Sequence, residues 1–394
     1  MKPLENIKVL DLSRVLAGPF CTMIMSDLGA EIIKVEVPER GDDSRCFGPF
    51  INGKSAYFMS VNHDKKSISL NLKSEKGKEI LLELVRKTDV VVENFRPGTM
   101  EKLGLGYDFL KTINPKLIYA SASGYGHTGP DSKKPGYDIL AQAAGVMGVT
   151  GWANMPPTRV GMSIGDLSAG LYLAIGTITA LYHRAMTGEG QKVDISLLDC
   201  QVALLENSVM RYQIENKNPK PIGNRHPTIT PFQAYKASDT YFVVGIGNET
   251  LWKTLCAAIQ KEELINDERF NTNKVRTENI VVLNEILEAL FLTKTSQEWL
   301  QIIEKAKVPC APINTIDKLF EDKQVKARNM LVDVHDPHAG DIKVPGNPVK
   351  MTNIPEVTKK KPAPEIGQDN EAVYAQMLGF DKATVEQLKK EGVI

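Results

Sequence analysis

Residues 7–35 read IKVLDLSRVLAGPFCTMIMSDLGAEIIKV, and this stretch decides the fold class. Its first six residues alternate as a strand does, and 30–35 form a second short apolar strand. Between them a helical pattern opens at Pro19, a residue that the first turn of a helix tolerates. Strand, helix and strand with short connections are typical of a right-handed parallel unit. The sequence therefore predicts an α/β fold with a Rossmann-like parallel sheet.

Further apolar strands and an amphipathic helix extend this unit. In an open parallel sheet the loops after the strands gather on one edge, which makes them candidates for a common site. No GxGxxG motif follows the first strand, so a dinucleotide cofactor is disfavoured. The expected strands are 67–72, 90–93, 117–120 and 193–196, and the expected helices are 74–87, 138–146 and 166–184.

The pattern changes at two places along the chain. A polar, proline-bearing connection at 217–223 precedes a hairpin and several helices, which indicate a smaller α+β domain. Short strands return after about residue 327, followed by a basic linker at 359–364 and two terminal helices. We expect a large α/β domain over 1–215, a small α+β domain over 216–326 and a C-terminal segment over 327–394. Within the small domain we expect a hairpin at 234–245 and helices at 249–259, 280–292 and 296–305.

The composition excludes several classes of function. The 48 basic and 48 acidic side chains cancel, so neither nucleic acid nor an anionic membrane surface is an expected partner. Five cysteines without a CxxC spacing, and six scattered histidines, argue against a disulfide framework and a metal site. No signal sequence opens the chain, and no stretch approaches the roughly 18 uninterrupted apolar residues of a membrane span. We therefore expect a cytoplasmic protein.

One carboxylate, Asp166, stands at a position suited to chemistry. It lies in the stretch GMSIGDLSAG (161–170), between Gly165 and an apolar run that predicts a long buried helix. A side chain at a helix start beside a glycine suits a nucleophile, because no Cβ crowds a ligand there. It equally suits a plain N-cap, and position alone favours the cap.

Basic residues follow the early strands and could hold an anionic, phosphate-bearing ligand. Each one singly is better explained as a solvated surface charge, whereas for the set the two explanations are evenly balanced. His127 and Tyr137 flank the same sheet edge. The basic residues are Lys34, Arg40, Arg45, Arg96 and Lys102.

Several motifs in order resemble the class III coenzyme A transferases, a family that includes the CaiB/BaiF and formyl-CoA transferase-like proteins. The resemblance covers nearly the whole chain, and ordered motifs at matching separations make it far more specific than any single motif. The motifs are VLDLSRVLAGP (9–19), LGAEIIKVE (28–36), GDDSR (41–45), ENFRPG (93–98), SGYG (123–126), GD (165–166) and TGEGQ (187–191).

This resemblance implies an architecture and a mechanism. Two identical ring-like chains would interlock as a homodimer, with each C-terminal segment returning to the first domain. Asp166 would attack the thioester carbonyl of a donor acyl-CoA to give a mixed anhydride and CoA thiolate. The thiolate would then form an aspartyl-CoA thioester and release the donor acid, and a carboxylic acid acceptor would repeat the exchange in reverse. The CoA thioester is then a substrate, and no tightly bound cofactor or metal is expected.

The resemblance also assigns roles to residues of this sequence. Val15 and Leu16 would line the site, backbone amides near Gly18 would face an oxyanion, and Tyr137 would abut the nucleophile. The residues expected to hold CoA are Asn94, Phe95, Arg96 and Lys102, with Lys34 and Arg45 as weaker candidates for its phosphates.

Alternatives within and outside the family stay open at this point. The α-methylacyl-CoA racemases have a His where we align Tyr137, and a phenol of pKa about 10 is a poor base, so transfer is favoured. Formyl-CoA:oxalate transferases have a Gln at Leu16 and a glycine loop in the small domain, so formate and oxalate are doubtful substrates. Arg14, Arg159 or Arg225 could pair with the distal carboxylate of a dicarboxylic acid, with succinyl-CoA as a donor. A catalytically silent acyl-CoA-binding protein, with Asp166 as a cap, is the hypothesis from another class.

Overall fold

The computed structural model describes residues 1–394. The chain forms two compact units, of which the first contains residues 1–148, 159–218 and 323–394. The second unit contains residues 149–158 and 219–322. The large domain expected over 1–215 includes residues 149–158, which belong to the second unit in the structure.

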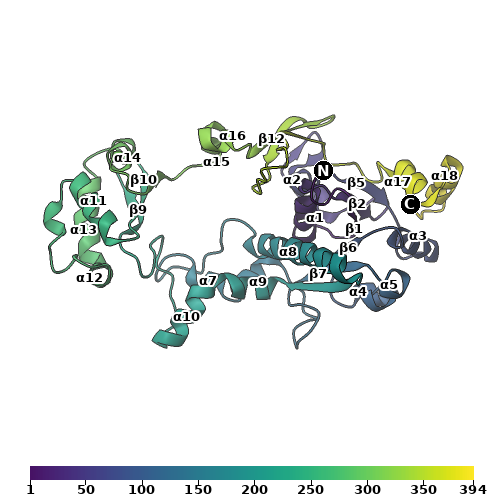
Figure 1. The fold of residues 1–394 in the computed structure, drawn as a ribbon, viewed down its shortest axis with the longest axis horizontal. Coiled ribbons are helices and arrows are strands. Elements are labelled where there is room, and N and C mark those ends of the chain that lie inside the picture. The colour runs from purple at the N-terminus through teal and green to yellow at the C-terminus, as the bar shows by residue number, and fades with distance from the viewer. The chain divides into compact units, whose positions relative to one another are not determined.

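A six-stranded parallel sheet is the centre of the first unit (Figure 1). Its strand order is β5-β2-β1-β6-β7-β8, so successive strands are added outward on both sides of β1. All five pairings are parallel, which confirms the predicted α/β class. The strands are β1 (Lys8–Asp11), β2 (Glu31–Glu36), β5 (Lys66–Ser69), β6 (Val90–Glu93), β7 (Ile118–Ser123) and β8 (Gln191–Ser196).

Helices cover both faces of this sheet because successive strand residues point to opposite sides. Val9 and Val90 face one core, which they share with α1 (Ala17–Asp27) and α8 (Ile164–Thr187). Leu10 and Val91 face the other core. That second face is covered by α3 (Glu75–Val85), α5 (Tyr107–Ile113), α17 (Asn370–Leu378) and α18 (Lys382–Lys390).

The C-terminal segment packs against the N-terminal sheet within the first unit. The Tyr374 hydroxyl donates to the Ser69 carbonyl over 2.8 Å, and the Asn71 N–H donates to the Val393 carbonyl over 2.8 Å. A second small sheet precedes these contacts, with β12 (Leu331–Asp336), β13 (Gly340–Pro345) and β14 (Lys359–Lys360). The prediction of a linker over 359–364 was wrong for its first two residues. Residues 359–360 form strand β14, which pairs in parallel with β12, and Lys360 also forms a buried ion pair with Asp27 of α1.

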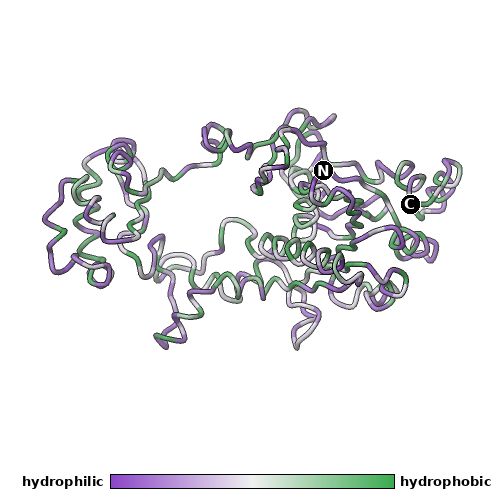
Figure 2. The backbone as a smooth tube through the Cα atoms, in the orientation of Figure 1, coloured by the Kyte–Doolittle hydropathy of each residue, from purple (hydrophilic) through white to green (hydrophobic).

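The helix α8 is long and apolar, as Figure 2 shows by its hydrophobic colouring. Its length and apolar composition would be sufficient to cross a membrane, and it is the one such helix in residues 1–394. Half of its apolar stretch is buried in the first unit, which is the pattern of a core helix. A single helix of this kind is weak evidence that the chain spans a membrane.

The second unit contains a three-stranded sheet with the order β11-β10-β9. The hairpin expected at 234–245 is confirmed as the antiparallel pair β9 (Phe232–Lys236) and β10 (Tyr241–Gly245). Trp252, Phe291 and Trp299 fill its core. The remaining elements here are β11 (Cys310–Pro312), α11 (Glu249–Ala258), α12 (Asn273–Glu278), α13 (Ile280–Phe291), α14 (Ser296–Lys305), α15 (Ile316–Glu321) and the short 3-10 turn at Glu262–Leu264.

Short elements complete the first unit, and most were not predicted, because two to ten residues carry too little periodicity to identify a helix or strand. They are a 3-10 turn at Asp43–Cys46, β3 (Phe50–Ile51), β4 (Lys54–Ser55), α2 (Ala56–Asn62), α4 (Thr99–Lys102), α6 (Asp138–Ala143), α9 (Leu197–Leu204), α10 (Glu206–Glu215) and α16 (Lys323–Ala327). The helix expected at 138–146 ends at Ala143, and a separate turn, α7 (Val146–Val149), spans the boundary between the two units.

Candidate active site

The topology creates a crevice between β1 and β6, where the strand order reverses direction. The loops after these two strands meet there: the Asn94 side chain accepts from the Arg14 N–H over 2.9 Å and donates to the Arg14 carbonyl over 2.7 Å. Beside them lies a cavity of about 760 Å³. It is lined mainly by residues 12–14, 34–43, 70–73, 95, 99, 102 and 103, from the carboxyl ends of four strands.

Three residues expected to hold CoA either line the cavity or are exposed without an ion-pair partner. Phe95 and Lys102 line the cavity, and Lys102 is exposed. Arg96 is also exposed, and neither it nor Lys102 forms an ion pair within residues 1–394. The unpaired ammonium of Lys102 at a cavity of this size suits a phosphate-bearing ligand, and the unpaired Arg96 follows Phe95 directly in the chain.

The side chains of the other three candidates already have partners within the protein, so their role in holding CoA stays a prediction. Lys34 is fully buried and pairs with Asp42 over 2.8 Å, and Arg45 makes a two-pronged ion pair with Glu36. The amide of Asn94 is used by the main chain of Arg14. A sequence pattern of basic residues cannot separate a free cation from one that neutralises a buried carboxylate.

The loop between β1 and α1 carries an unusual backbone. Val15 has a φ of +67°, a left-handed conformation that a β-branched residue rarely adopts. A Cβ at Gly18 would lie 2.2 Å from the Ser13 Cβ, so only glycine fits at this close approach. Leu16, expected to line the site, is buried at 9% exposure and immediately precedes α1. The first N–H groups of α1 have no partner within the helix and are free to face an anion.

Asp166 lies in the first turn of α8, not at its N-cap. The helix begins at Ile164 after Ser163, so the N-cap interpretation from the sequence was wrong. The carboxylate is half-buried, accepts no hydrogen bond and pairs with no cation in residues 1–394. A buried carboxylate without a partner is costly, which indicates that the site retains it for chemistry.

Asp138 lies beside this carboxylate. It accepts from the Gly165 N–H over 2.8 Å and from the Gln142 amide over 2.8 Å. Burial first, and the negative charge of Asp138 second, raise the pKa of Asp166 to about 7. The Asp166 carboxyl group therefore keeps its proton to a higher pH than a solvated aspartate does.

The β1–α1 loop reaches the same region through helix packing. A Cβ at Gly170, one turn beyond Asp166, would lie 2.7 Å from the Ala17 carbonyl oxygen. The two helices thus touch where α1 begins, which brings the free amides of α1 toward the start of α8.

Two tyrosines, Tyr137 and Tyr57, belong to the surroundings of Asp138 and Asp166, and only Tyr137 was predicted from the sequence. Tyr137 precedes α6 and is 69% exposed, so its expected contact with Asp166 stays a prediction. Tyr57 on α2 was missed, because no motif surrounds it. Burial first, and then the charges of Asp166 and Asp138, raise the pKa of Tyr57. Its phenol therefore stays protonated and can donate a hydrogen bond near Asp166.

One of the three arginines proposed for a distal carboxylate lies close to these groups. Arg159 is 3.9 Å from Asp138, and its side chain is 46% exposed. Arg14 pairs with Asp43 over 2.9 Å and faces the ring of Phe95. Arg225 belongs to the second unit.

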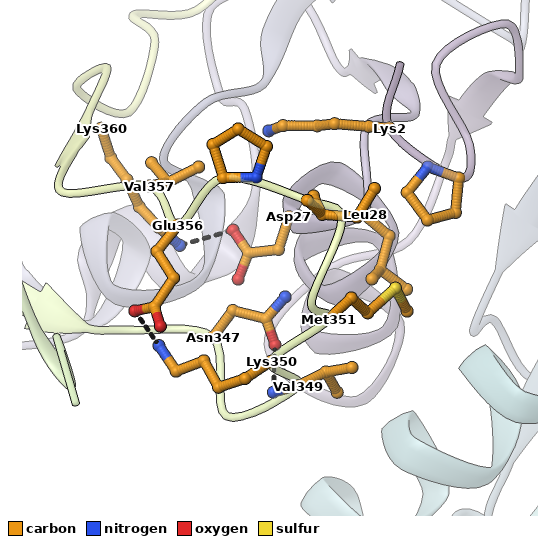
Figure 3. Close-up of a pocket in the computed structure, with 13 residues that line it drawn as sticks. Lys2, Asp27, Leu28, Asn347, Val349, Lys350, Met351, Glu356, Val357 and Lys360 are labelled. Carbon is orange, nitrogen blue, oxygen red and sulfur yellow. Dashed lines mark hydrogen bonds and ion pairs between the residues drawn. The ribbon is translucent and has the colours of Figure 1, made fainter.

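A separate, small cavity of about 40 Å³ lies between the end of α1 and residues 347–360 (Figure 3). The ammonium of Lys360 bonds to Asp27 over 2.5 Å at its wall, and His63 and Asp64 lie close to that carboxylate. These three side chains could ligate a metal ion, but Lys360 already neutralises Asp27. None of the residues expected at the active site lines this cavity.

Comparison with known proteins agrees with the motifs and the geometry. A sequence profile of CoA-transferase family III matches residues 4–370. The chain belongs to this family. It is 41% identical to a mouse succinyl-CoA:glutarate CoA-transferase, over 100% of this chain and 91% of the relative. It is 43% identical to an acetyl-CoA:oxalate CoA-transferase of Acetobacter aceti, over 94% and 95% of the two chains.

A solved structure supports the same assignment. A CaiB/BaiF family protein from Brucella suis superposes with a TM-score of 0.83 at 38% identity, covering 95% of this chain and 99% of that one. The chain is thus a CoA-transferase, and its substrates are CoA thioesters and carboxylic acids. The preference for transfer over racemisation and over silent binding is confirmed.

Proposed function

We propose that this CoA-transferase works through a covalent intermediate on Asp166. A carboxylate oxygen of Asp166 attacks the thioester carbon of the donor, the C–S bond breaks, and CoA leaves as a thiolate. The thiolate attacks the Asp166 carbonyl of the resulting anhydride and expels the donor carboxylate. The acceptor carboxylate then attacks the aspartyl thioester, the C–S bond breaks, and CoA thiolate leaves a second anhydride behind. The thiolate attacks the acceptor carbonyl of this anhydride, which forms the product thioester and releases the Asp166 carboxylate.

The observation that carries this proposal is the unpaired, half-buried carboxylate of Asp166. Its raised pKa makes the ionised form more basic, and hence more nucleophilic, than a solvated carboxylate. The free amides at the start of α1 supply donors for the oxyanion that forms at the thioester carbonyl. Val15, Leu16 and Gly18 shape that end of the site.

We further propose that Phe95, Arg96 and Lys102 hold CoA at the 760 Å³ cavity. The cavity opens at the switch point of the sheet, where ligands bind in open α/β folds. One wall is the loop after β1, so CoA bound there would direct its thioester toward the start of α1.

Succinyl-CoA is our proposed donor, and a dicarboxylic acid our proposed acceptor. Glutarate and oxalate, named for the two relatives, are both dicarboxylates. Arg159 supports this choice, because its guanidinium is half exposed and lies 3.9 Å from Asp138, the carboxylate that raises the pKa of Asp166. Oxalate is also a candidate acceptor, because one relative is named for it. The motifs of the formyl-CoA:oxalate transferases had made oxalate a doubtful substrate.

We propose that the enzyme acts as an interlocked homodimer in the cytoplasm. Large apolar side chains stay exposed along α8, including Ile175 at 59%, Tyr182 at 67% and Met186 at 62%. The helix α10 buries none of its residues. Apolar surface of this extent along two helices suits the interface of a second copy.

Trapping the intermediate tests the mechanism. The enzyme would be mixed with succinyl-CoA and reduced with borohydride, and the peptide containing Asp166 analysed by mass. Reduction converts an aspartyl thioester to an alcohol, so modification should appear at Asp166. Asp166→Ala should carry no adduct, retain CoA binding and lose kcat by about 1000-fold or more. Wild-type turnover without any adduct at this position would disprove the covalent route.

A further inference from the structure

Side chains hold five backbone N–H and carbonyl groups of residues 13–15, in the loop before α1. Asp11 accepts from the Ser13 N–H over 3.0 Å, and Lys34 donates to the Ser13 carbonyl over 2.8 Å. Asn94 holds both the N–H and the carbonyl of Arg14. Asp42 accepts from the Val15 N–H over 3.0 Å. Side-chain partners for so many consecutive backbone groups are unusual in a loop, where water commonly satisfies such groups.

The last of these hydrogen bonds acts on Val15, the residue with the least favourable backbone conformation. Val15 is left-handed at φ +67°, and its branched Cβ makes this conformation unfavourable. A strained backbone persists only where its surroundings over-determine it. The hydrogen bond from the Val15 N–H to Asp42 is the contact that acts on this residue directly.

Asp42 must be a carboxylate to do this. Its Oδ1 accepts from the N–H groups of Val15 and Ser44 and from the Ser44 hydroxyl, while Oδ2 faces the Lys34 ammonium at 2.8 Å. Burial would raise its pKa, but the charge and hydrogen bond of Lys34 and the backbone N–H groups hold the pKa at about 2. All of its neighbours are donors. An asparagine has one acceptor oxygen, so either orientation of its amide would set N–H against a donor.

We propose that Asp42, with Lys34 as its counter-charge, is a positioning residue that locks Val15 in the left-handed conformation and thereby aims the amides of α1 at the thioester carbonyl. This inference rests on the proposed function, because it assigns those amides to the oxyanion. Neither residue touches the substrate carbonyl in this account. Asp42 acts through Val15, and Lys34 acts through Asp42.

The test compares Asp42→Asn with a matched variant, Asp336→Asn. Asp336 is an equally buried carboxylate of the same unit, which pairs with Lys54 over 2.7 Å and accepts from the N–H groups of His338 and Ala339. Both variants lose a buried ion pair, so both should lower the melting temperature. Only Asp42→Asn should lower kcat, by about 100-fold as expected for a displaced catalytic group, while the KM for the CoA thioester changes less than about threefold.

A second substitution tests the strain directly. Glycine adopts positive φ without cost, so Val15→Gly introduced into Asp42→Asn should raise kcat above that of Asp42→Asn alone. A crystal structure of Asp42→Asn should show Val15 outside the left-handed region. The inference would be overturned if Val15 kept its φ in the Asp42→Asn structure. It would also be overturned if Asp42→Asn and Asp336→Asn lowered kcat equally. Failure of the proposed function would look different, since the wild-type enzyme would then form no adduct at Asp166.

Discussion

Asp138 holds its negative charge directly beside Asp166. It accepts from the N–H of Gly165, the residue before Asp166, and so cannot move away from the start of α8. A Cβ at Gly165 would lie 2.9 Å from Asp138 Oδ1, so glycine is required for this approach. Burial and this second carboxylate together keep the pKa of Asp166 near 7, where a small change in surroundings alters its ionisation.

The rate of transfer should therefore depend on pH through Asp166. Only the ionised carboxylate attacks, so kcat/KM should rise with pH and level off above about 7. Asp138→Asn removes one cause of the raised pKa and should move this rise to lower pH. Initial rates between about pH 5 and 9 measure the shift. Asp131→Asn, a change at an exposed carboxylate, should leave the profile in place, and an unshifted profile for Asp138→Asn would contradict the coupling.

The same pKa predicts an effect on stability. A carboxyl whose pKa rises from 3.8 to about 7 on folding binds its proton more tightly when folded. Its contribution to stability is therefore present below about pH 4 and is lost as the pH rises toward 7. At about pH 8, Asp166→Asn should stabilise the fold by about 1–2 kcal/mol, a value discounted for partial exposure. Thermal unfolding at about pH 8 and pH 4 checks this, since the gain should vanish at the lower pH.

The parallel sheet could be predicted because its strands carry short apolar runs between helical patterns. The carboxyl-end location of the site followed from the same pattern. Tyr57 and the pairing of Asp138 with Gly165 could not be predicted, because both depend on contacts between segments far apart in the chain. Lys34 shows the limit most clearly. Its position near the carboxyl end of β2 matches that of a phosphate ligand, yet its partner Asp42 makes it a buried structural cation.

Lys102 should contribute to CoA affinity. Its ammonium is exposed at the cavity and has no partner in residues 1–394, so a phosphate would gain a charge-assisted contact there. Lys102→Ala should raise the Kd for CoA by about tenfold and weaken its salt dependence, with kcat little changed. Lys111→Ala, a change to a lysine that does not line this cavity, is the control. Isothermal titration at two salt concentrations distinguishes them, and equal affinities for the two variants would exclude Lys102 from the CoA site.

The exposed apolar face of α8 should be needed for self-association. Ile175→Glu places a charge in the middle of this face and should prevent assembly, because burying an unpaired carboxylate is costly. Light scattering should give twice the 43.5 kDa chain mass for the wild type and less for the variant. Val281→Glu, on a 68% exposed position of α13, should leave the mass unchanged. A wild-type mass of 43.5 kDa would rule out the homodimer.

Arg159 should decide between dicarboxylic and monocarboxylic acceptors. Its guanidinium lies 3.9 Å from Asp138, too far for a strong bond, so it can turn toward a bound acid whose reacting carboxylate faces Asp166. Arg159→Gln should raise the KM for glutarate by about tenfold, the loss of one charge-assisted contact, and leave the KM for acetate unchanged. Arg86→Gln removes an arginine of similar exposure at the C-cap of α3 and should affect neither acid. If the KM rose equally for both acids, Arg159 would act on the reacting carboxylate or on the fold, and the distal-carboxylate role would be wrong.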